Sequence, residues 1–180
     1  MRNVKRIFVV WILLSSLTSF VSFEKKDKPA RGLNVGSVAP DFEIKAADEQ
    51  SLALSNFKGR YVLLSFWASY DAQSRIQNIC LSNAVRSAFP SVEMVSVSFD
   101  EYRSVFTETI RKDQIVAAVC FVETTGMKSG LFEKYRLNQG FISYLLDKDG
   151  IILAKDVSIE QLDTFLNNEL LASSGEKTGS

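Results

Sequence analysis

The sequence contains no histidine and only two cysteines among its 180 residues. Without histidine, the Ser-His-Asp and Cys-His catalytic schemes and all His-containing zinc sites are excluded. Cys80 and Cys120 lie 40 positions apart, so they cannot form a Cys-x-x-Cys pair or a four-cysteine metal cage. The sequence therefore predicts no metal site and no bound cofactor.

An excess of charge of either sign is also missing. The chain has 21 Lys and Arg residues against 21 Asp and Glu residues, and it lacks the basic surface that a nucleic-acid partner would require. Hydrophobic residues make up 46% of the chain and charged residues 23%, which is enough apolar material for a core and excludes general disorder. We expect one domain with a targeting segment and a tail.

The first 23 residues are basic and then apolar. Residues 7–23 (IFVVWILLSSLTSFVSF) follow three basic residues, a pattern typical of a secretory signal peptide. An uncleaved membrane anchor is the alternative, although this run is at the short end for a membrane span. We expect export to the periplasm or cell envelope, with membrane contact only through residues 1–23 if they are retained. The predicted boundaries are a linker at 24–33, a domain at 34–171 and a disordered tail at 172–180.

Strands and helices are predicted to alternate along the domain, which favours an α/β fold. Residues 61–67 (YVLLSFW) form a nearly continuous apolar run, as expected of a central strand buried on both faces. Other strands are predicted at 41–44, 92–99, 115–122, 141–146 and 151–155, the last two joined by a hairpin with a glycine at Gly150. Residues 51–59 are expected to be a polar connection.

Helices are predicted between these strands from apolar spacing and capping residues. Asp100 is expected to cap one helix, Ser129 a short one, and Ser158 with Gln161 the last one as a capping box. The predicted core-facing residues of the first helix are Ala72, Ile76, Ile79, Cys80 and Ala84, and those of the second are Tyr102, Val105, Phe106, Thr109 and Ile110.

Several segments together resemble one family. Residues 36–42 (GSVAPDF), 54–69 (LSNFKGRYVLLSFWAS) and 135–147 (YRLNQGFISYLLD) are similar to exported bacterial thiol:disulfide oxidoreductases and peroxiredoxin-like proteins of the AhpC/TSA type, within the thioredoxin-like superfamily. The resemblance covers about residues 36–170. It implies a thioredoxin fold, a central mixed β-sheet flanked by helices on both faces.

The sequence departs from this family at its redox site. Aligned to the family pattern W-A-S-W-C-x-x-C-R, Asp71 stands at the position of the nucleophilic cysteine and Ser74 at that of the resolving cysteine. Phe141 stands where the family has a cis-proline. A cis bond before a residue other than proline costs about 2.5–4 kcal/mol, so we expect the Gly140–Phe141 peptide to be trans.

These substitutions suggest structural roles. Asp71 is expected at a helix N-terminus, where its carboxylate can accept the N–H of Gln73 or Ser74 as an N-cap. A catalytic acid at Asp71 is the alternative, but neither it nor Ser74 has an activating base in the sequence. We therefore predict no catalytic residues at this site.

The sequence allows several roles for the two cysteines. Cys80 is predicted to be a small buried hydrophobe on the first helix, and Cys120 to be half-buried in or beside an edge strand. Export would permit a disulfide between them, but nothing in the sequence brings them into bonding range. The alternative is that one of them reacts as a single thiol.

Aromatic residues gather around the substituted site. The fold would bring Trp67, Tyr70 and Phe141 together as a candidate binding patch. The alternative is that Trp67 and Tyr144 belong to the core and only Tyr70 and Phe141 are exposed. We expect an exported thioredoxin-fold protein that has lost its redox dithiol, is not an active enzyme and binds a protein or peptide. A residual thiol oxidoreductase or peroxidase using Cys80 or Cys120 is the competing hypothesis, and a structural accessory subunit is a third.

Overall fold

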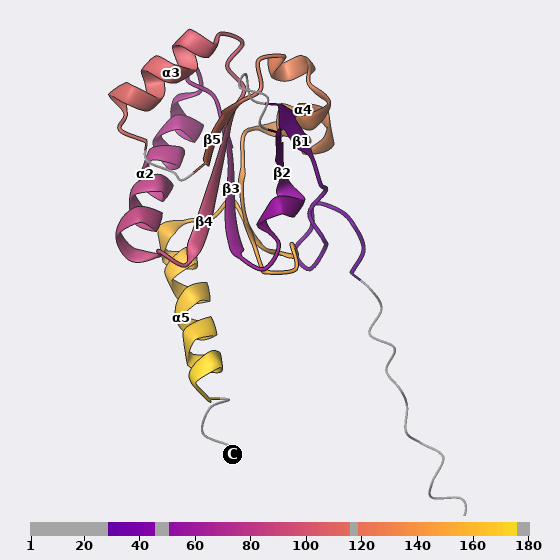
Figure 1. Cartoon of the computed structure of the whole chain (residues 1–180), viewed down its shortest axis with the longest axis vertical. Helices are drawn as coiled ribbons and strands as arrows, with labels where there is room; N and C mark the ends of the chain where they lie inside the picture. The colour runs from indigo at the N-terminus through magenta and orange to yellow at the C-terminus, as the bar shows by residue number, and fades with distance from the viewer. Residues whose placement is uncertain (1–28, 46–50, 116–118, 176–180) are drawn as a thin grey trace, which may run out of the picture.

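The structure, a computed structural model, describes residues 29–45, 51–115 and 119–175 (Figure 1). In chain order its elements are β1 (Glu43–Lys45), β2 (Ser51–Ala53), η1 (Leu54–Phe57), β3 (Tyr61–Trp67), α2 (Ala72–Ala88), β4 (Val92–Ser98), α3 (Arg103–Lys112), β5 (Val119–Val122), η2 (Gly126–Lys128), α4 (Gly130–Lys134), η3 (Leu137–Gln139), β6 (Ser143–Leu146), β7 (Ile152–Lys155) and α5 (Ile159–Gly175).

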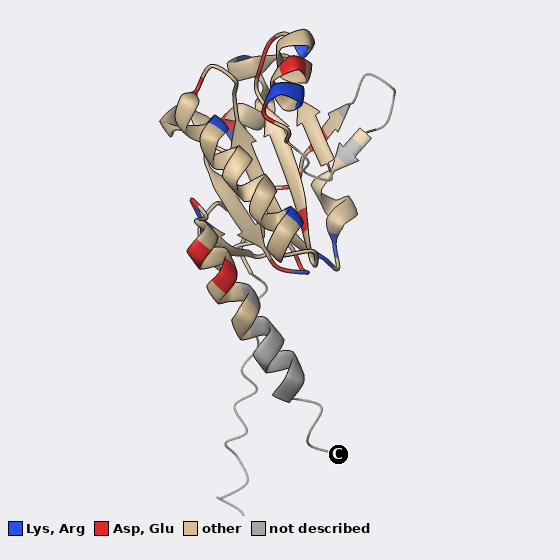
Figure 2. Ribbon diagram, turned by 90° about the vertical axis from the view of Figure 1, so that its left-hand side faces the viewer, with Lys and Arg blue, Asp and Glu red and all other residues tan. Residues whose placement is uncertain are grey.

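A five-stranded mixed sheet forms the centre of the molecule. Its strand order is β5-β4-β3-β6-β7, in which β3, β4 and β5 are parallel and β6 and β7 run antiparallel to their neighbours. The predicted central strand is confirmed, because every residue of β3 from Val62 to Trp67 is buried. Neither β3 nor β6 contains a charged residue, and Figure 2 shows the charges mainly on helices and at strand ends. The predicted α/β fold with a mixed sheet is therefore confirmed.

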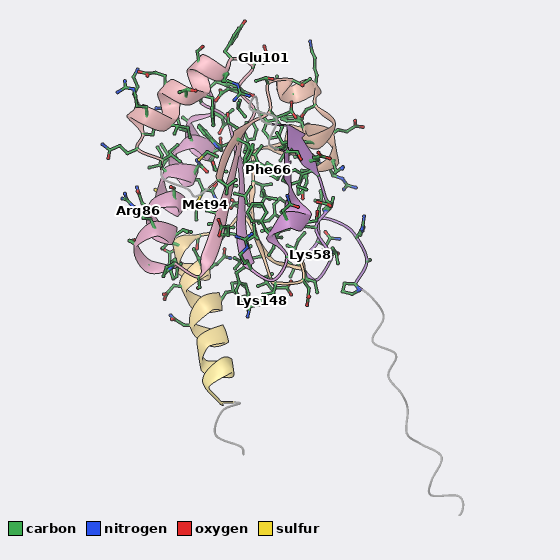
Figure 3. All side chains as sticks on the ribbon, in the orientation of Figure 1. Lys58, Phe66, Arg86, Met94, Glu101 and Lys148 are labelled. Atoms are coloured by element: carbon green, nitrogen blue, oxygen red, sulfur yellow. The ribbon has the colours of Figure 1, made fainter. Side chains whose placement is uncertain are left out.

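The two faces of the sheet pack against different elements. Successive side chains of a strand point to opposite faces, and Phe66 of β3 accordingly joins an aromatic cluster on the side of α4, while Leu63 joins a cluster with α2 and α5. Figure 3 shows Phe66 on the first side and Met94 of β4 on the second. Helices α2, α3 and α5 lie on one side and α4, with β1 and β2, on the other (Figure 1).

Three local predictions are confirmed. The hydroxyl oxygen of Ser129 accepts the backbone N–H of Phe132 at 3.1 Å and caps α4. Ser158 and Gln161 exchange the two hydrogen bonds of a capping box at 3.2 and 3.1 Å. The hairpin between β6 and β7 has Gly150 at φ 81°, a left-handed conformation that glycine adopts without strain.

The predicted buried face of α2 is wrong at Ala72, Ile76 and Cys80, whereas Ile79 and Ala84 are partly buried and pack against the core as predicted. Cys80 is exposed and Ile76 is 61% exposed, whereas the buried positions are Ser74, Asn78, Leu81, Ser82 and Val85. The reason is that polar residues of α2 bond within the protein: Asn78 Oδ1 accepts the hydroxyl of Ser96 on β4 at 3.0 Å. A rule that looks for apolar spacing cannot detect a buried face built partly of serine and asparagine.

The predicted face of α3 is wrong at its start, and so is its cap. Phe106 and Thr109 are buried as expected, but Tyr102 and Val105 are 69% and 42% exposed. Asp100 does not cap the helix; the capping position is Tyr102, which makes no side-chain cap bond. Asp100 is instead drawn toward neighbouring serines, as described below.

Other boundaries also differ from expectation. Residues 51–59 contain β2 and η1, whose Leu54 and Phe57 are buried, because local turns place these apolar side chains on the aromatic cluster. Strand β5 is shorter than the predicted 115–122, and residues 116–118 lie outside the described residues.

The folded domain extends beyond its predicted limits at both ends. Leu33 packs against the aromatic cluster and Arg31 forms a β-bridge with Val38, so part of the expected linker joins the domain. At the other end, α5 continues to Gly175, beyond the predicted start of the tail. The predicted signal or anchor segment, residues 24–28 and residues 176–180 lie outside the described residues. Over the described ranges, no helix combines the length and apolarity that crossing a bilayer would require.

Candidate functional site at the start of helix α2

Asp71 caps helix α2 as predicted. Its backbone is extended, with φ −100° and ψ 102°, and its Oδ1 accepts the backbone N–H of Ser74 at 2.8 Å. This bond satisfies one of the N–H groups that every helix start leaves without an intrahelical partner. The carboxylate also lies at the positive end of the helix dipole, which stabilises negative charge.

Ser74 is the third residue of α2 and is almost completely buried. Its hydroxyl donates to the carbonyl oxygen of Asp71 at 3.2 Å and accepts the N–H of Ala68 at 3.4 Å. Both positions aligned with the family's cysteines are therefore held by short-range hydrogen bonds around the turn between β3 and α2. These bonds give both side chains a structural role.

Phe141 lies opposite this turn and packs in a group of tilted and edge-to-face aromatic rings. Its ring centroid is 5.9 Å from that of Phe99 and 6.2 Å from that of Phe132, both of which are buried. The preceding Gly140 has φ 126°, and the described residues contain no cis peptide bond, so the Gly140–Phe141 bond is trans as expected. Phe141 itself is half-buried.

Tyr70 is the most exposed member of this aromatic group. Its ring centroid is 6.3 Å from that of Phe141, and its side chain is 60% exposed. Burial raises the pKa of the Tyr70 hydroxyl, and the negative charges of Asp100, Glu101 and Asp71 raise it further. An aromatic side chain that remains this exposed between two carboxylate-bearing turns is available for contact with a partner.

Trp67 does not belong to this exposed surface. It is fully buried, its Nε1 donates to the hydroxyl of Ser96 at 2.8 Å, and its ring packs 6.4 Å from that of Phe106. Tyr144 is also buried. The candidate patch of Trp67, Tyr70 and Phe141 is thus corrected to Tyr70 and Phe141. Trp67 is buried because it is the last residue of the central strand β3, before the chain turns towards α2.

Two grooves adjoin this pair, one lined by Phe141 and the other by Tyr70. The first, which we call the polar groove, has a volume of about 430 Å³ and contains all three substituted motif positions. Its side chains carry charges of both signs. Among its lining residues are Asp71, Ser74, Gln77, Arg136, Phe141 and Lys155.

The second, which we call the acidic groove, has a volume of about 280 Å³. It forms where the turns after β3 and β4 meet the start of α3 and η2. The sequence does not predict this groove, because apolar spacing places Tyr102 and Val105 in the core and Met127 carries no local signal. Its principal lining residues are Tyr70, Asp100, Glu101, Tyr102, Val105 and Met127.

The two thiols lie on different elements and do not form a dithiol site. Neither forms a disulfide: Cys80 is exposed on α2, and Cys120 is half-buried on the edge strand β5, as predicted for Cys120. Burial raises the pKa of the Cys120 thiol to about 11, opposed by a hydrogen bond with Ser96. Among the described residues, no group of three or more Cys, Asp or Glu side chains is arranged to hold a metal ion.

The fold and the position of this turn define the class of the protein. A helix that begins directly after the central parallel strand, facing the loop before β6, is the arrangement of thioredoxin-like proteins. The sequence model of the AhpC/TSA family matches residues 35–155, more than half of the chain. The chain belongs to the AhpC/TSA family, within the thioredoxin-like thiol-disulfide oxidoreductases.

Individual relatives agree with this assignment. The crystal structure of a thioredoxin-like protein from Parabacteroides distasonis is 40% identical, covers 78% of this chain and 99% of its own, and superimposes with a TM-score of 0.68. A thiol-disulfide oxidoreductase from Bacteroides fragilis is 27% identical, with 73% and 98% coverage and a TM-score of 0.61. The thioredoxin-like protein YneN of Bacillus subtilis is 24% identical over 151 residues, which are 80% of this chain and 84% of that protein.

Proposed function

We propose that this chain is an exported thioredoxin-fold protein that has no redox dithiol and binds a protein or peptide in the cell envelope. The observation that carries the proposal is the start of α2, where Asp71 and Ser74 hold each other in a capping hydrogen bond of 2.8 Å. Thiol-disulfide exchange requires a thiolate as the attacking group. A carboxylate and a buried hydroxyl at these positions cannot supply one.

The binding part of the proposal is supported by the surface beside this turn. Tyr70 is exposed next to Phe141, and grooves of about 430 and 280 Å³ adjoin the pair. An exposed tyrosine offers a large contact area with few rotatable bonds, which is why tyrosine is enriched in protein interfaces. Export is supported by the signal-like pattern of residues 7–23.

Insulin reduction tests the loss of redox activity. The purified protein with dithiothreitol should reduce insulin no faster than dithiothreitol alone, because neither substituted position carries sulfur. A variant with Cys80→Ala and Cys120→Ala is the matched control and should behave identically. Turnover that the native protein shows and this variant lacks would contradict the proposal.

A display library of random linear peptides tests binding. Selected peptides should bind the native protein, and Tyr70→Ser should weaken them by about tenfold, as expected when an interface anchor is removed. Ile76→Ser is the matched control, because Ile76 is 61% exposed on α2 and lines neither groove. Failure to select any peptide, or equal losses in the two variants, would contradict the binding role.

The exposure of Cys80 supports a second candidate function, a single-thiol oxidoreductase or peroxidase. A reactive thiol of this kind has a pKa well below 8.5. The rate of iodoacetamide alkylation, followed against pH in the Cys120→Ala variant, measures the pKa of Cys80 directly. A value well below 8.5 together with peroxide turnover would favour this function over the first, whereas an ordinary value would exclude it.

A further inference from the structure

The acidic groove gathers much of the apolar surface that the protein exposes. Within the described parts of the chain, seven large hydrophobic side chains are exposed, and four of them line this groove: Tyr70, Tyr102, Val105 and Met127. They come from three segments far apart in sequence. Such a concentration is unusual for a surface that faces only water, because exposed apolar side chains are ordinarily scattered singly.

The groove also carries negative charge that no cation of its lining balances. Its charged lining residues are Asp100 and Glu101, without a lysine or arginine. Asp100 is only 3% exposed and accepts hydrogen bonds from uncharged groups: the N–H and hydroxyl of Ser69 at 3.1 and 2.5 Å, and the hydroxyl of Ser98 at 2.6 Å. A buried carboxylate gains further stabilisation when a positive charge approaches it.

Glu101 stands at the rim of the groove. Its side chain lies against the backbone of Gly126, so close that a Cβ on that glycine would come within 3.0 Å of the Glu101 Cγ. Figure 3 shows Glu101 at the top of the molecule, at the end of the sheet opposite Lys148. Gly126 is followed directly by Met127, so the carboxylate and the exposed methionine belong to one edge of the groove.

The ion pairs of the described residues leave these two carboxylates without a cationic partner. Arg75, whose pKa is raised mainly by its hydrogen bond to Asp113 and further by the charge of Asp100, is already bound to Asp113 through two hydrogen bonds of 2.5 and 2.6 Å. The polar groove, which Phe141 lines, differs because Arg136 and Lys155 also line it. The two grooves therefore present different charge to a bound segment.

We infer that the acidic groove binds a lysine or arginine side chain of an extended peptide segment, with an apolar residue of the same segment against Met127 and Val105. This inference rests on the proposed peptide-binding function and specifies its partner. The methylene stem of a basic side chain can pack on the apolar walls while its charged end approaches the carboxylates. The rings of Tyr70 and Tyr102 add a favourable surface for a cation.

Electrostatics at Tyr70 agree with this assignment. The pKa of its hydroxyl is raised by burial and then by Asp100, Glu101 and Asp71, so negative potential surrounds the ring from the acidic-groove side and from the α2 cap. A positive group on a bound segment would enter a field that already favours it.

The peptide selection described above tests the inference by the composition of the selected peptides. Lysine and arginine next to an apolar residue should be enriched. A selected peptide is then made with its basic residue and with norleucine in its place. Norleucine should weaken binding to the native protein by about fivefold at low salt, and the difference should shrink as salt rises.

A charge-removing variant completes the test. Glu101→Gln should weaken the basic peptide by about fivefold and leave the norleucine peptide unchanged. Glu133→Gln on α4 is the matched control, because it removes the same charge from an exposed residue outside the groove. If peptides bind through Tyr70 without enrichment of basic residues, or if the two variants act alike, the inference is wrong while the proposed function stands. If no peptide is selected, both fail.

Discussion

The start of α2 and the two cysteine positions differ in what each offers to redox chemistry. At the start of α2, free N–H groups and the helix dipole favour an anion, and the residue present is the carboxylate of Asp71. Cys120 carries a thiol, but on a strand where burial raises its pKa to about 11. Cys80 carries a thiol on the exposed side of α2, beyond its second turn.

A thiol and the local environment that lowers its pKa are therefore separate properties of a protein. A helix N-terminus favours an anion whichever residue occupies it, because the effect comes from backbone N–H groups and the helix dipole. A cysteine elsewhere does not inherit that activation.

Restoring the thiols at the start of α2 should have the largest effect. Asp71→Cys with Ser74→Cys places two thiols one helical turn apart at a helix N-terminus, so the pair should close into a disulfide. We expect complete disulfide formation in an oxidising glutathione buffer, measured by mass spectrometry after alkylation. Both new thiols remaining free would show that these residues do not occupy the Cys-x-x-Cys positions.

Turnover should require one further change in the same variant. Phe141 projects from the loop facing the pair and contacts Tyr70, so it occupies space that a substrate disulfide would need. Adding Phe141→Pro to the double variant should therefore increase insulin reduction. Equal rates for the double and triple variants would show that Phe141 does not obstruct the site.

Ionisation of the Cys120 thiol should make the stability of the protein depend on pH. Because the pKa of Cys120 is raised from 9.0 to about 11, folding favours its neutral form. The stabilisation from the neutral Cys120 thiol is complete below pH 9. It is lost as the pH rises towards 11, because in this range the thiol ionises in the unfolded chain before it ionises in the folded protein. The loss should be about 2–3 kcal/mol. Urea unfolding of the native protein and of Cys120→Ala across this window measures it, and equal pH slopes would contradict the prediction.

Removing the cap should have a smaller effect. Asp71→Ala deletes the acceptor of the Ser74 N–H and should lower the free energy of unfolding by about 1 kcal/mol. Asp71→Asn retains an acceptor and should lose less. The midpoints of urea unfolding measure both changes. A stability of Asp71→Ala equal to that of the native protein would mean that the capping bond contributes nothing.

The exposed thiol should matter least to stability. Cys80→Ser should change the free energy of unfolding by less than about 0.5 kcal/mol, because the side chain faces solvent and its replacement leaves no buried hydroxyl. The same urea measurement applies. A loss of 1 kcal/mol or more would indicate that Cys80 packs against a neighbour after all.

Local features of the fold were predictable because each depends on a few neighbouring residues. The Asp71 cap, the Ser158–Gln161 capping box and the turn at Gly150 are all found as predicted. The central strand was equally clear, because burial on both faces requires an apolar run that few other structures produce.

The faces of the helices were less predictable. The buried side of α2 contains Ser74, which bonds to the preceding turn, and Asn78, which bonds to Ser96 on β4, so apolar spacing alone missed these positions. Tyr102 likewise follows the apolar spacing of α3 and yet is exposed. Which face is buried depends on the surface against which a helix packs, and that surface is built from distant segments.

The sequence by itself determined the α/β class and the capped starts of α2, α4 and α5. Tertiary structure alone decided that Trp67 is internal, that Cys80 is exposed and that an acidic groove exists. The physical reason is the separation along the chain between the residues that interact. Backbone hydrogen bonds and caps act over a few residues, whereas the groove exists only because the sheet brings the ends of β3 and β4 beside Met127.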